Sequence, residues 1–92
     1  MIRSFADRDT EEFFFTGKGR RFGTILVVGF RKLQALDNAR ELIDLRSPPG
    51  NRLEALKGDR TGQHSIRVND QFRICFVWKD GAPESVEIVD YH

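Results

Sequence analysis

The 92-residue chain has little of what marks secreted, zinc-binding or membrane-spanning proteins. Its single cysteine, Cys75, excludes an internal disulfide and a zinc site built on several thiolates. The longest stretch without a charged residue covers only the nine residues 22–30, which is too short to cross a membrane. Acidic residues begin at Asp7, so a secretory signal pattern is absent, as are repeats and glycine-rich phosphate loops. We therefore expect a cytoplasmic protein with one domain, residues 1–92, and no membrane partner.

The charge is small in total and uneven along the chain. The formal net charge is +1, with 39% hydrophobic and 32% charged residues, which is typical of a globular protein and excludes simple disorder. Residues 16–33 contain no acid and five basic residues, namely Lys18, Arg20, Arg21, Arg31 and Lys32. This segment predicts a basic surface that contacts RNA, and the alternative is an ordinary solvated helix.

The first half of the chain predicts a short strand and two helices. A partly alternating strand is expected at residues 2–5. Asp7 or Asp9 can cap a helix that ends near Phe15 at Gly17, with Glu12 completing a capping box after Asp9. A second helix is expected from the apolar stripe of Phe22, Ile25, Leu26, Gly29, Phe30, Leu33 and Leu36. A helical turn over residues 39–45 ends before Pro48 and Pro49.

Beyond the prolines the apolar residues alternate, as they do in strands. The expected strands cover residues 51–57, 64–68, 72–78 and 84–91. The fold class is therefore α+β: a strand and two helices, followed by an antiparallel sheet of three to four strands with the helices on one face.

The register of the central hairpin is set by its apolar residues. A three-residue loop, 69–71, pairs Val68 with Phe72 and Ile66 with Ile74, which gives one continuous apolar face. The same register places Arg67 opposite Arg73 on the other face, as exposed strand arginines. Because like charges across a pair of strands are destabilising, we expect an anion, such as a phosphate, to bind between them.

Three stretches of the chain resemble one known family. They are residues 49–59 (PGNRLEALKGD), 65–76 (SIRVNDQFRICF) and 86–92 (VEIVDYH), together with MIRSF at the start and Arg31–Lys32–Leu33 in the second helix. Over nearly the full length the chain resembles the HigB toxins of the RelE superfamily of bacterial toxin–antitoxin systems. The resemblance implies a RelE-like fold and a HigA-like helix-turn-helix antitoxin as partner. It also implies cleavage of messenger RNA in the decoding site of the 70S ribosome.

Metal-free RNA cleavage needs a base for the 2′-hydroxyl, cations for the phosphate and an acid for the leaving oxygen. The guanidinium groups of Arg67 and Arg73 suit the cation role, with Lys57 adding a second positive contact. The resemblance favours Arg73 as the catalytic arginine. It also implies that Glu54 is catalytic in a position where many relatives have histidine.

The last three residues are expected in the site. His92 is the natural proton-transfer group, Asp90 can orient it, and Tyr91 can stack on a base. His64 and Trp78 are expected in or beside the core, and Cys75 as an inert sheet residue. No residue set predicts a metal or a cofactor.

Three functions remain open on the sequence alone. The leading one is a ribosome-dependent messenger RNA endoribonuclease. The second is a catalytically weakened RelE-like module that still binds RNA or the antitoxin, which the presence of Glu54 favours. A stand-alone ribonuclease is the third, and it is the weakest because few groups with a pKa near 7 are available.

Overall fold

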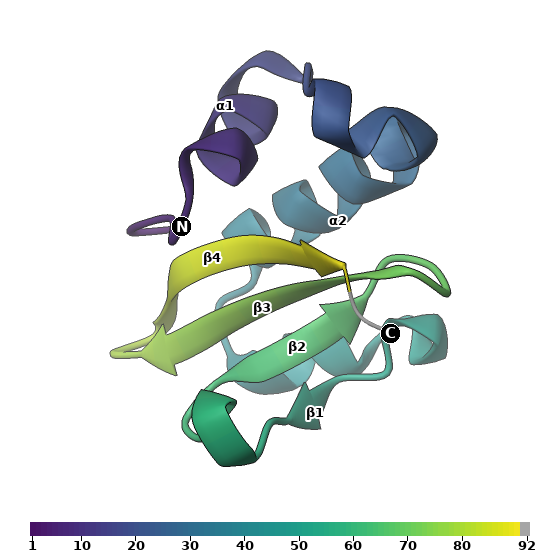
Figure 1. Cartoon of the computed structure of the whole chain (residues 1–92). Coiled ribbons are helices and arrows are strands. Elements are labelled where there is room, and N and C mark those ends of the chain that lie inside the picture. Colours follow the sequence, from purple (N-terminus) through teal and green to yellow (C-terminus); the bar gives the residue numbers. More distant parts are fainter. Residues whose placement is uncertain (91–92) are drawn as a thin grey trace.

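The structure, a computed structural model that describes residues 1–90, has helices on one face of a four-stranded antiparallel sheet (Figure 1). The sheet order is β1-β2-β3-β4, so each strand lies beside its neighbour in sequence. The strands are β1 (Glu54–Ala55), β2 (His64–Arg67), β3 (Phe72–Lys79) and β4 (Ala82–Asp90). The expected α+β class, with an antiparallel sheet and helices on one of its faces, is confirmed.

Two α-helices and four short 3-10 helices cover and connect the sheet. The α-helices are α1 (Arg8–Thr16) and α2 (Leu26–Asn38). The 3-10 helices are η1 (Arg20–Ile25), η2 (Leu42–Arg46), η3 (Pro49–Asn51) and η4 (Gly58–Arg60). None of the helices within residues 1–90 is long and apolar enough to cross a membrane.

Helix α1 begins and ends close to the predicted positions. Gly17 closes it in the left-handed conformation, with a φ of 72°, and its N–H donates to the carbonyl of Phe13. The cap residue is Asp7, whose side chain makes no capping hydrogen bond, so the capping box of Asp9 and Glu12 is wrong. The carboxylate of Asp7 binds Arg21 instead.

The second predicted helix is divided into η1 and α2. The backbone of Phe22 is non-helical within η1, and the regular α-helix begins only at Leu26. Val27, Val28 and Gly29 lie within α2 although they are poor helix formers. Ile25, Gly29, Leu33 and Leu36 are buried as expected. Leu26 and Phe30 were expected in the same stripe, but Leu26 is 37% exposed and Phe30 only partly buried.

The hydrophobic core lies between the helices and one face of the sheet. Phe13 of α1 and Leu33 and Leu36 of α2 are fully buried. The sheet contributes Ile66, Ile74, Phe76, Val86 and Ile88, all with no exposed surface. Trp78 packs against the edge of this core, as expected, and His64 stacks against Phe76 with ring centroids 6.3 Å apart.

The predicted hairpin register is confirmed. Ile66 pairs with Ile74 and Arg67 with Arg73, and the N–H of Val68 donates to the carbonyl of Phe72. The side chain of Asn69 accepts the N–H groups of Gln71 and Phe72, which fixes the three-residue loop. The two arginines therefore lie on the face of the sheet opposite the core.

Two predicted strands are wrong in extent. Residues 2–5 form a single parallel bridge, Phe5 to Val86, because within the described part of the chain their backbone groups bond only to Pro83 and Val86 of β4 and, from Ile2, to the carboxylate of Asp37 in α2. The strand expected over residues 51–57 contains only Glu54 and Ala55. Asn51 belongs to η3 and Arg52 takes the left-handed conformation, which ends extended pairing at that side.

Candidate functional site

Arg73 is the centre of the polar face of the sheet. Its side chain is only 12% exposed. Nε donates to Ser65 Oγ at 2.8 Å, and Nη2 donates to the backbone carbonyl of Arg52 at 2.8 Å. Nη2 also lies 3.5 Å from Glu54 Oε1. These contacts hold the guanidinium in one orientation above the sheet.

Two of these partners were not expected from the sequence. Ser65 is fully buried on the polar face, one strand away from Arg73 and opposite Glu54. Arg52 reaches the guanidinium with its carbonyl because it follows η3 in the left-handed conformation, with a φ of 46°. The alternation that places Arg67 on this face also places Ser65 on it, so the position of the serine could have been predicted from the sequence. The contact of the Arg52 carbonyl could not.

Arg67 and Arg73 do not need a bound anion to tolerate each other. Arg67 forms an ion pair with Asp70 in the hairpin loop, and Arg73 has Ser65, Arg52 and Glu54 as partners. The expectation that like charges across the hairpin require a phosphate between them is therefore wrong as a stability argument. The chain supplies the compensation itself.

Glu54 and Lys57 lie at the same edge of the sheet but serve different neighbours. Glu54 is 53% exposed at its side chain and pairs with Arg73. Lys57 is exposed, just before η4, and forms no ion pair with a described carboxylate. Orientation of Lys57 by Glu54 is therefore not seen, since two residues three apart in an extended segment point to opposite sides.

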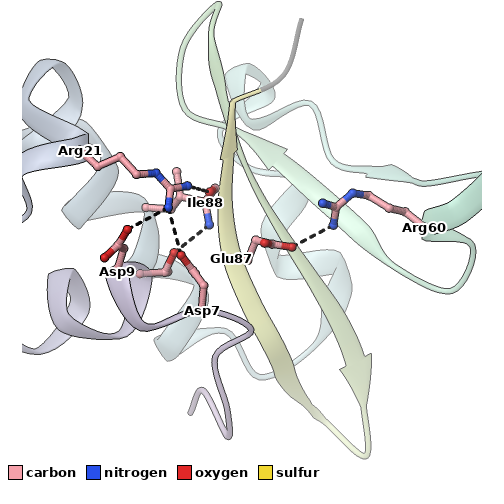
Figure 2. A network of polar contacts seen from close by, with 7 residues as sticks. Asp7, Asp9, Arg21, Arg60, Glu87 and Ile88 are labelled. Carbon is pink, nitrogen blue, oxygen red and sulfur yellow. Dashed lines mark hydrogen bonds and ion pairs between the residues drawn. The ribbon is translucent and has the colours of Figure 1, made fainter.

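A second pair of charges covers the polar face beside Arg73. Arg60 forms an ion pair with Glu87 (Figure 2), with Nη1 3.1 Å from Glu87 Oε1. Arg60 Nη1 also donates a hydrogen bond to Gln63 Oε1. Cys75 faces the same side as Glu87, its strand partner, and is fully buried. Burial raises the pKa of the Cys75 thiol above its ordinary value, and Glu87 adds to this while Arg60 opposes it. The cysteine is thus a protonated sheet residue at neutral pH.

The end of β4 lies next to Arg73. Val89 pairs with Arg73, whereas Asp90 pairs with Phe72 and so belongs to the opposite face by alternation. Asp90 Oδ2 accepts a hydrogen bond from the amide of Gln71 at 3.0 Å. Tyr91 and His92 lie outside the described residues.

The basic residues of the first half divide into two kinds. Arg21 bridges three elements: Nη1 lies 3.2 Å from both Asp7 and Asp9, and Nη2 donates to the carbonyl of Ile88 (Figure 2). Lys32 donates to the buried side chain of Asn51. Through these contacts Arg21 and Lys32 link different elements of the fold. Arg20 and Arg31 are exposed and form no ion pair within residues 1–90.

The environment of Lys32 shows that positive charges of α2 and of the sheet lie close together. Its pKa is lowered, first by burial and then by the charges of Arg31 and Arg67. The end of the hairpin and the middle of α2 therefore share one region of positive potential. Such a region attracts polyanions, and salt weakens the attraction where the charges are exposed.

Taken together, the polar face offers an oriented guanidinium with an exposed carboxylate at its side. A guanidinium can bind a phosphate through two parallel hydrogen bonds, and a carboxylate can take up a proton. A phosphate that approached Arg73 would compete with Glu54 for the same positive charge.

The sequence and the fold were compared with known proteins. The sequence model of the HigB-like toxins, described as RelE-like toxins of the type II toxin–antitoxin system HigB, matches residues 3–92. The chain is 46% identical over 83 residues to Toxin HigB-1 of Vibrio cholerae, covering 88% of this chain and 87% of that protein. It is 39% identical over 61 residues to Endoribonuclease HigB of Proteus vulgaris, covering 66% and 65%.

The fold is also similar to a solved structure of low sequence identity. A chain of the YoeB-YefM complex from Staphylococcus aureus superposes with a TM-score of 0.61 at 17% identity, covering 100% of this chain and 98% of that one. At this identity the likeness concerns the fold alone.

Proposed function

Because this chain belongs to the HigB-like toxin family, the RelE-like toxins of type II toxin–antitoxin systems, we propose that it is an endoribonuclease. In this proposal it acts in the cytoplasm and cuts messenger RNA in the decoding site of the 70S ribosome. A HigA-like helix-turn-helix antitoxin neutralises it. The observation that carries the proposal is the guanidinium of Arg73, held by Ser65 and Arg52 on the polar face. The curated relative named Endoribonuclease HigB supports the type of activity.

The proposed reaction needs no metal ion. The 2′-oxygen of the nucleotide before the cut loses its proton and attacks the adjacent phosphorus. The bond from phosphorus to the 5′-oxygen breaks, and that oxygen gains a proton. The products are a 2′,3′-cyclic phosphate and a 5′-hydroxyl. Arg73 binds the phosphate and stabilises the negative charge that builds up on it in the transition state.

Four residues are proposed for the proton transfers and the positioning of the RNA. Glu54 is exposed and lies beside Arg73, so a ribose whose phosphate contacts Arg73 can present its 2′-hydroxyl to this carboxylate. His92, whose imidazole is the natural proton-transfer group, is proposed as the acid. Asp90 is proposed to orient His92, and Tyr91 to stack on a base.

The remaining basic residues are proposed as RNA contacts that do not take part in the chemistry. Arg67 and Lys57 flank the polar face, and Arg20 is exposed on η1. Arg21, Lys32 and Arg31 add to the positive potential, although the first two also link elements within the fold. The ribosome is required in this proposal because so few groups surround Arg73, and the decoding site positions the messenger for them.

One observation favours the weaker alternative, a RelE-like module that binds RNA or the antitoxin without cutting. The ion pair between Glu54 and Arg73 partly neutralises the guanidinium that would receive the phosphate. A neutral or protonated partner at this position would leave the full charge for the substrate. The alternative predicts binding of ribosomes without cleavage.

The test is cleavage of a defined messenger by the purified protein, with and without programmed 70S ribosomes. We expect fragments only when ribosomes are present, each ending in a 2′,3′-cyclic phosphate. Cleavage of naked RNA at the same rate would contradict the ribosome dependence. Binding without cleavage would establish the alternative module.

Glu54→Gln examines the proton acceptor in the same assay. If the carboxylate accepts the 2′-proton, the single-turnover rate falls roughly 100-fold or more, and the acidic limb of the pH profile changes. If Glu54 only restrains Arg73, the rate stays equal or rises because the phosphate no longer competes with a carboxylate. Glu12→Gln, at an exposed carboxylate on α1, is the control.

A further inference from the structure

A hollow on the outer side of the helical layer has no role in the proposed chemistry. It has a volume of about 410 Å³ and is lined by Gly17, Leu26, Val27, Phe30, Arg31 and Gln34. Five of these residues belong to α2 and Gly17 closes α1, so the hollow follows the junction of the two helices. We refer to this set of six residues as the α2 hollow.

The α2 hollow lies on a second face of the helix that adjoins the core face, and Phe30 takes part in both because its ring also packs against Phe13, with ring centroids 6.1 Å apart. Leu26, Phe30 and Gln34 follow one another at four-residue steps, as Val27 and Arg31 do, so the five side chains share one side of α2. The core face is formed by Gly29, Leu33 and Leu36. A helix with a second apolar face is unusual in a small protein, because exposed apolar side chains gain nothing from the fold.

The exposure is large where the helix begins. Val27 is 71% exposed and Leu26 37% exposed. Valine is a poor helix former at a solvent-facing position, where alanine, lysine or glutamate would stabilise the helix more. The presence of valine at position 27 therefore does not stabilise this chain by itself. Burial of its side chain against another molecule would account for it.

The rim of the α2 hollow is positive. Arg31 lines it and forms no ion pair with a carboxylate in residues 1–90, and none of the six lining residues is acidic. The surface thus combines an apolar floor with an unneutralised cation at its edge, which is complementary to an apolar segment that carries acidic side chains.

We propose that the α2 hollow is a docking surface for an acidic, apolar segment of the antitoxin, a proposal that rests on the function proposed above. Two copies of this chain joined symmetrically through the hollow would bring Arg31 against Arg31, and like charges disfavour that arrangement. RNA is held mainly through phosphates and stacked bases; Arg31 can bind a phosphate, but the most exposed apolar side chain of the hollow, Val27, offers neither contact, and burial of its apolar surface favours a protein segment. The antitoxin is the remaining occupant.

The test measures the affinity of the purified protein for its cognate antitoxin by isothermal titration. Val27→Asp places a negative charge in the hollow and should weaken binding at least tenfold. Val27→Lys removes the same apolar side chain but keeps the sign of the rim, so its effect should be several-fold smaller. Ile43→Asp is the matched control, since Ile43 is a similarly accessible apolar residue on η2, 59% exposed, and it should bind as the parent does.

Each outcome decides the proposal. Parental affinity of Val27→Asp overturns it, and equally weakened binding by the Asp and Lys variants overturns the acidic character of the segment. A dimer of the free protein that Val27→Asp dissociates assigns the hollow to a second copy. Weaker ribosome binding with unchanged antitoxin affinity assigns it to RNA.

Messenger cleavage by antitoxin-free Val27→Asp should match the parent, which separates a failure here from a failure of the proposed activity. Circular dichroism confirms folding, because aspartate in the first turn of α2 is favourable.

Discussion

At the scale of single residues, Arg73 differs from an ordinary strand arginine. Its side chain is 12% exposed and has Ser65, the carbonyl of Arg52 and Glu54 as partners. In the proposed reaction, a guanidinium that is already oriented lacks the ordering cost that a free arginine would have when RNA binds. The same contacts make Arg73 a structural residue as well.

Arg73→Ala is expected to remove most of the activity and also to lower stability. Loss of an oriented charge from the transition state reduces kcat by roughly 10²–10³-fold. Truncation leaves Ser65 and the Arg52 carbonyl without their donor, which costs on the order of 1–3 kcal/mol. Chemical denaturation and ribosome-dependent cleavage measure the two effects separately.

Arg73→Lys is the control for this prediction. It keeps the charge but loses the planar fork, so both cleavage and stability should be intermediate. Activity of Arg73→Ala near the parental value, at a temperature where the variant is folded, would show that Arg73 does not act on the phosphate.

Cys75 gives a prediction on pH. Burial, helped by Glu87, raises its pKa in the folded protein above the value of 9.0 for a free thiol. Between these two pKa values the unfolded chain has lost the thiol proton while the folded chain keeps it, so stability falls as the pH rises above about 9. Cys75→Ser removes this part of the alkaline destabilisation, which urea unfolding at pH 7 and pH 10 measures. An equal alkaline destabilisation in both proteins would contradict the assignment.

At the scale of elements, the contact between α1 and α2 depends on Gly29. A Cβ atom there would lie 3.2 Å from Phe13 Cε2 and 3.2 Å from Ile25 Cδ1, both buried. The helices can approach closely because this position has no side chain. The approach also brings Gly17 near Phe30, at the base of the α2 hollow.

Gly29→Ala is expected to destabilise the protein. The added methyl group forces Phe13 and Ile25 to move, which costs about 1–3 kcal/mol and exceeds the gain of roughly 1 kcal/mol in helix propensity. Gly23→Ala is the matched control: its Cβ meets no atom within 4 Å, so it should leave stability unchanged or raise it by about 0.4–1 kcal/mol. Thermal unfolding measures both variants, and an equal decrease in melting temperature for the two would contradict this account.

At the scale of the whole molecule, the basic residues fall into two groups: those that form ion pairs within the fold and those that are exposed. Neighbours in the sequence can belong to different groups. Arg20 and Arg21 are neighbours, but only Arg21 forms ion pairs within residues 1–90, joining η1 to Asp7, Asp9 and β4. The near-neutral total of +1 therefore combines internally compensated arginines with exposed cations. In the proposed function, these exposed cations are the charges available to the ribosome.

Substitution of these neighbours should separate the two roles. Arg21→Gln lowers the melting temperature, since it breaks the links between η1, the start of α1 and β4. Arg20→Gln leaves the melting temperature unchanged and makes the salt dependence of ribosome binding shallower, by roughly one unit of slope if Arg20 binds one phosphate. An unchanged salt slope for Arg20→Gln would mean that Arg20 is only a solvated residue.

The sequence alone determined the central hairpin and the core faces of the fold. The alternation from Ile66 to Ile74 admits one loop length that keeps the apolar side chains together, and that loop places Arg67 opposite Arg73. The buried stripe of Ile25, Gly29 and Leu33 follows from helical spacing in the same way. Both are short-range patterns, because each depends on residues within a few positions of one another.

Only the tertiary structure decided which polar residues meet. The carbonyl of Arg52 reaches Arg73 across 21 positions, and Arg21 reaches Ile88 across 67. Such contacts depend on where connecting turns place the backbone, which no local periodicity encodes. For the same reason Leu26, a member of the predicted apolar stripe, matches that pattern equally well in a core or at a docking surface, and Val27 beside it lay outside the stripe. Their exposure beside Gly17 and Arg31 became visible only once α1 and α2 were packed together.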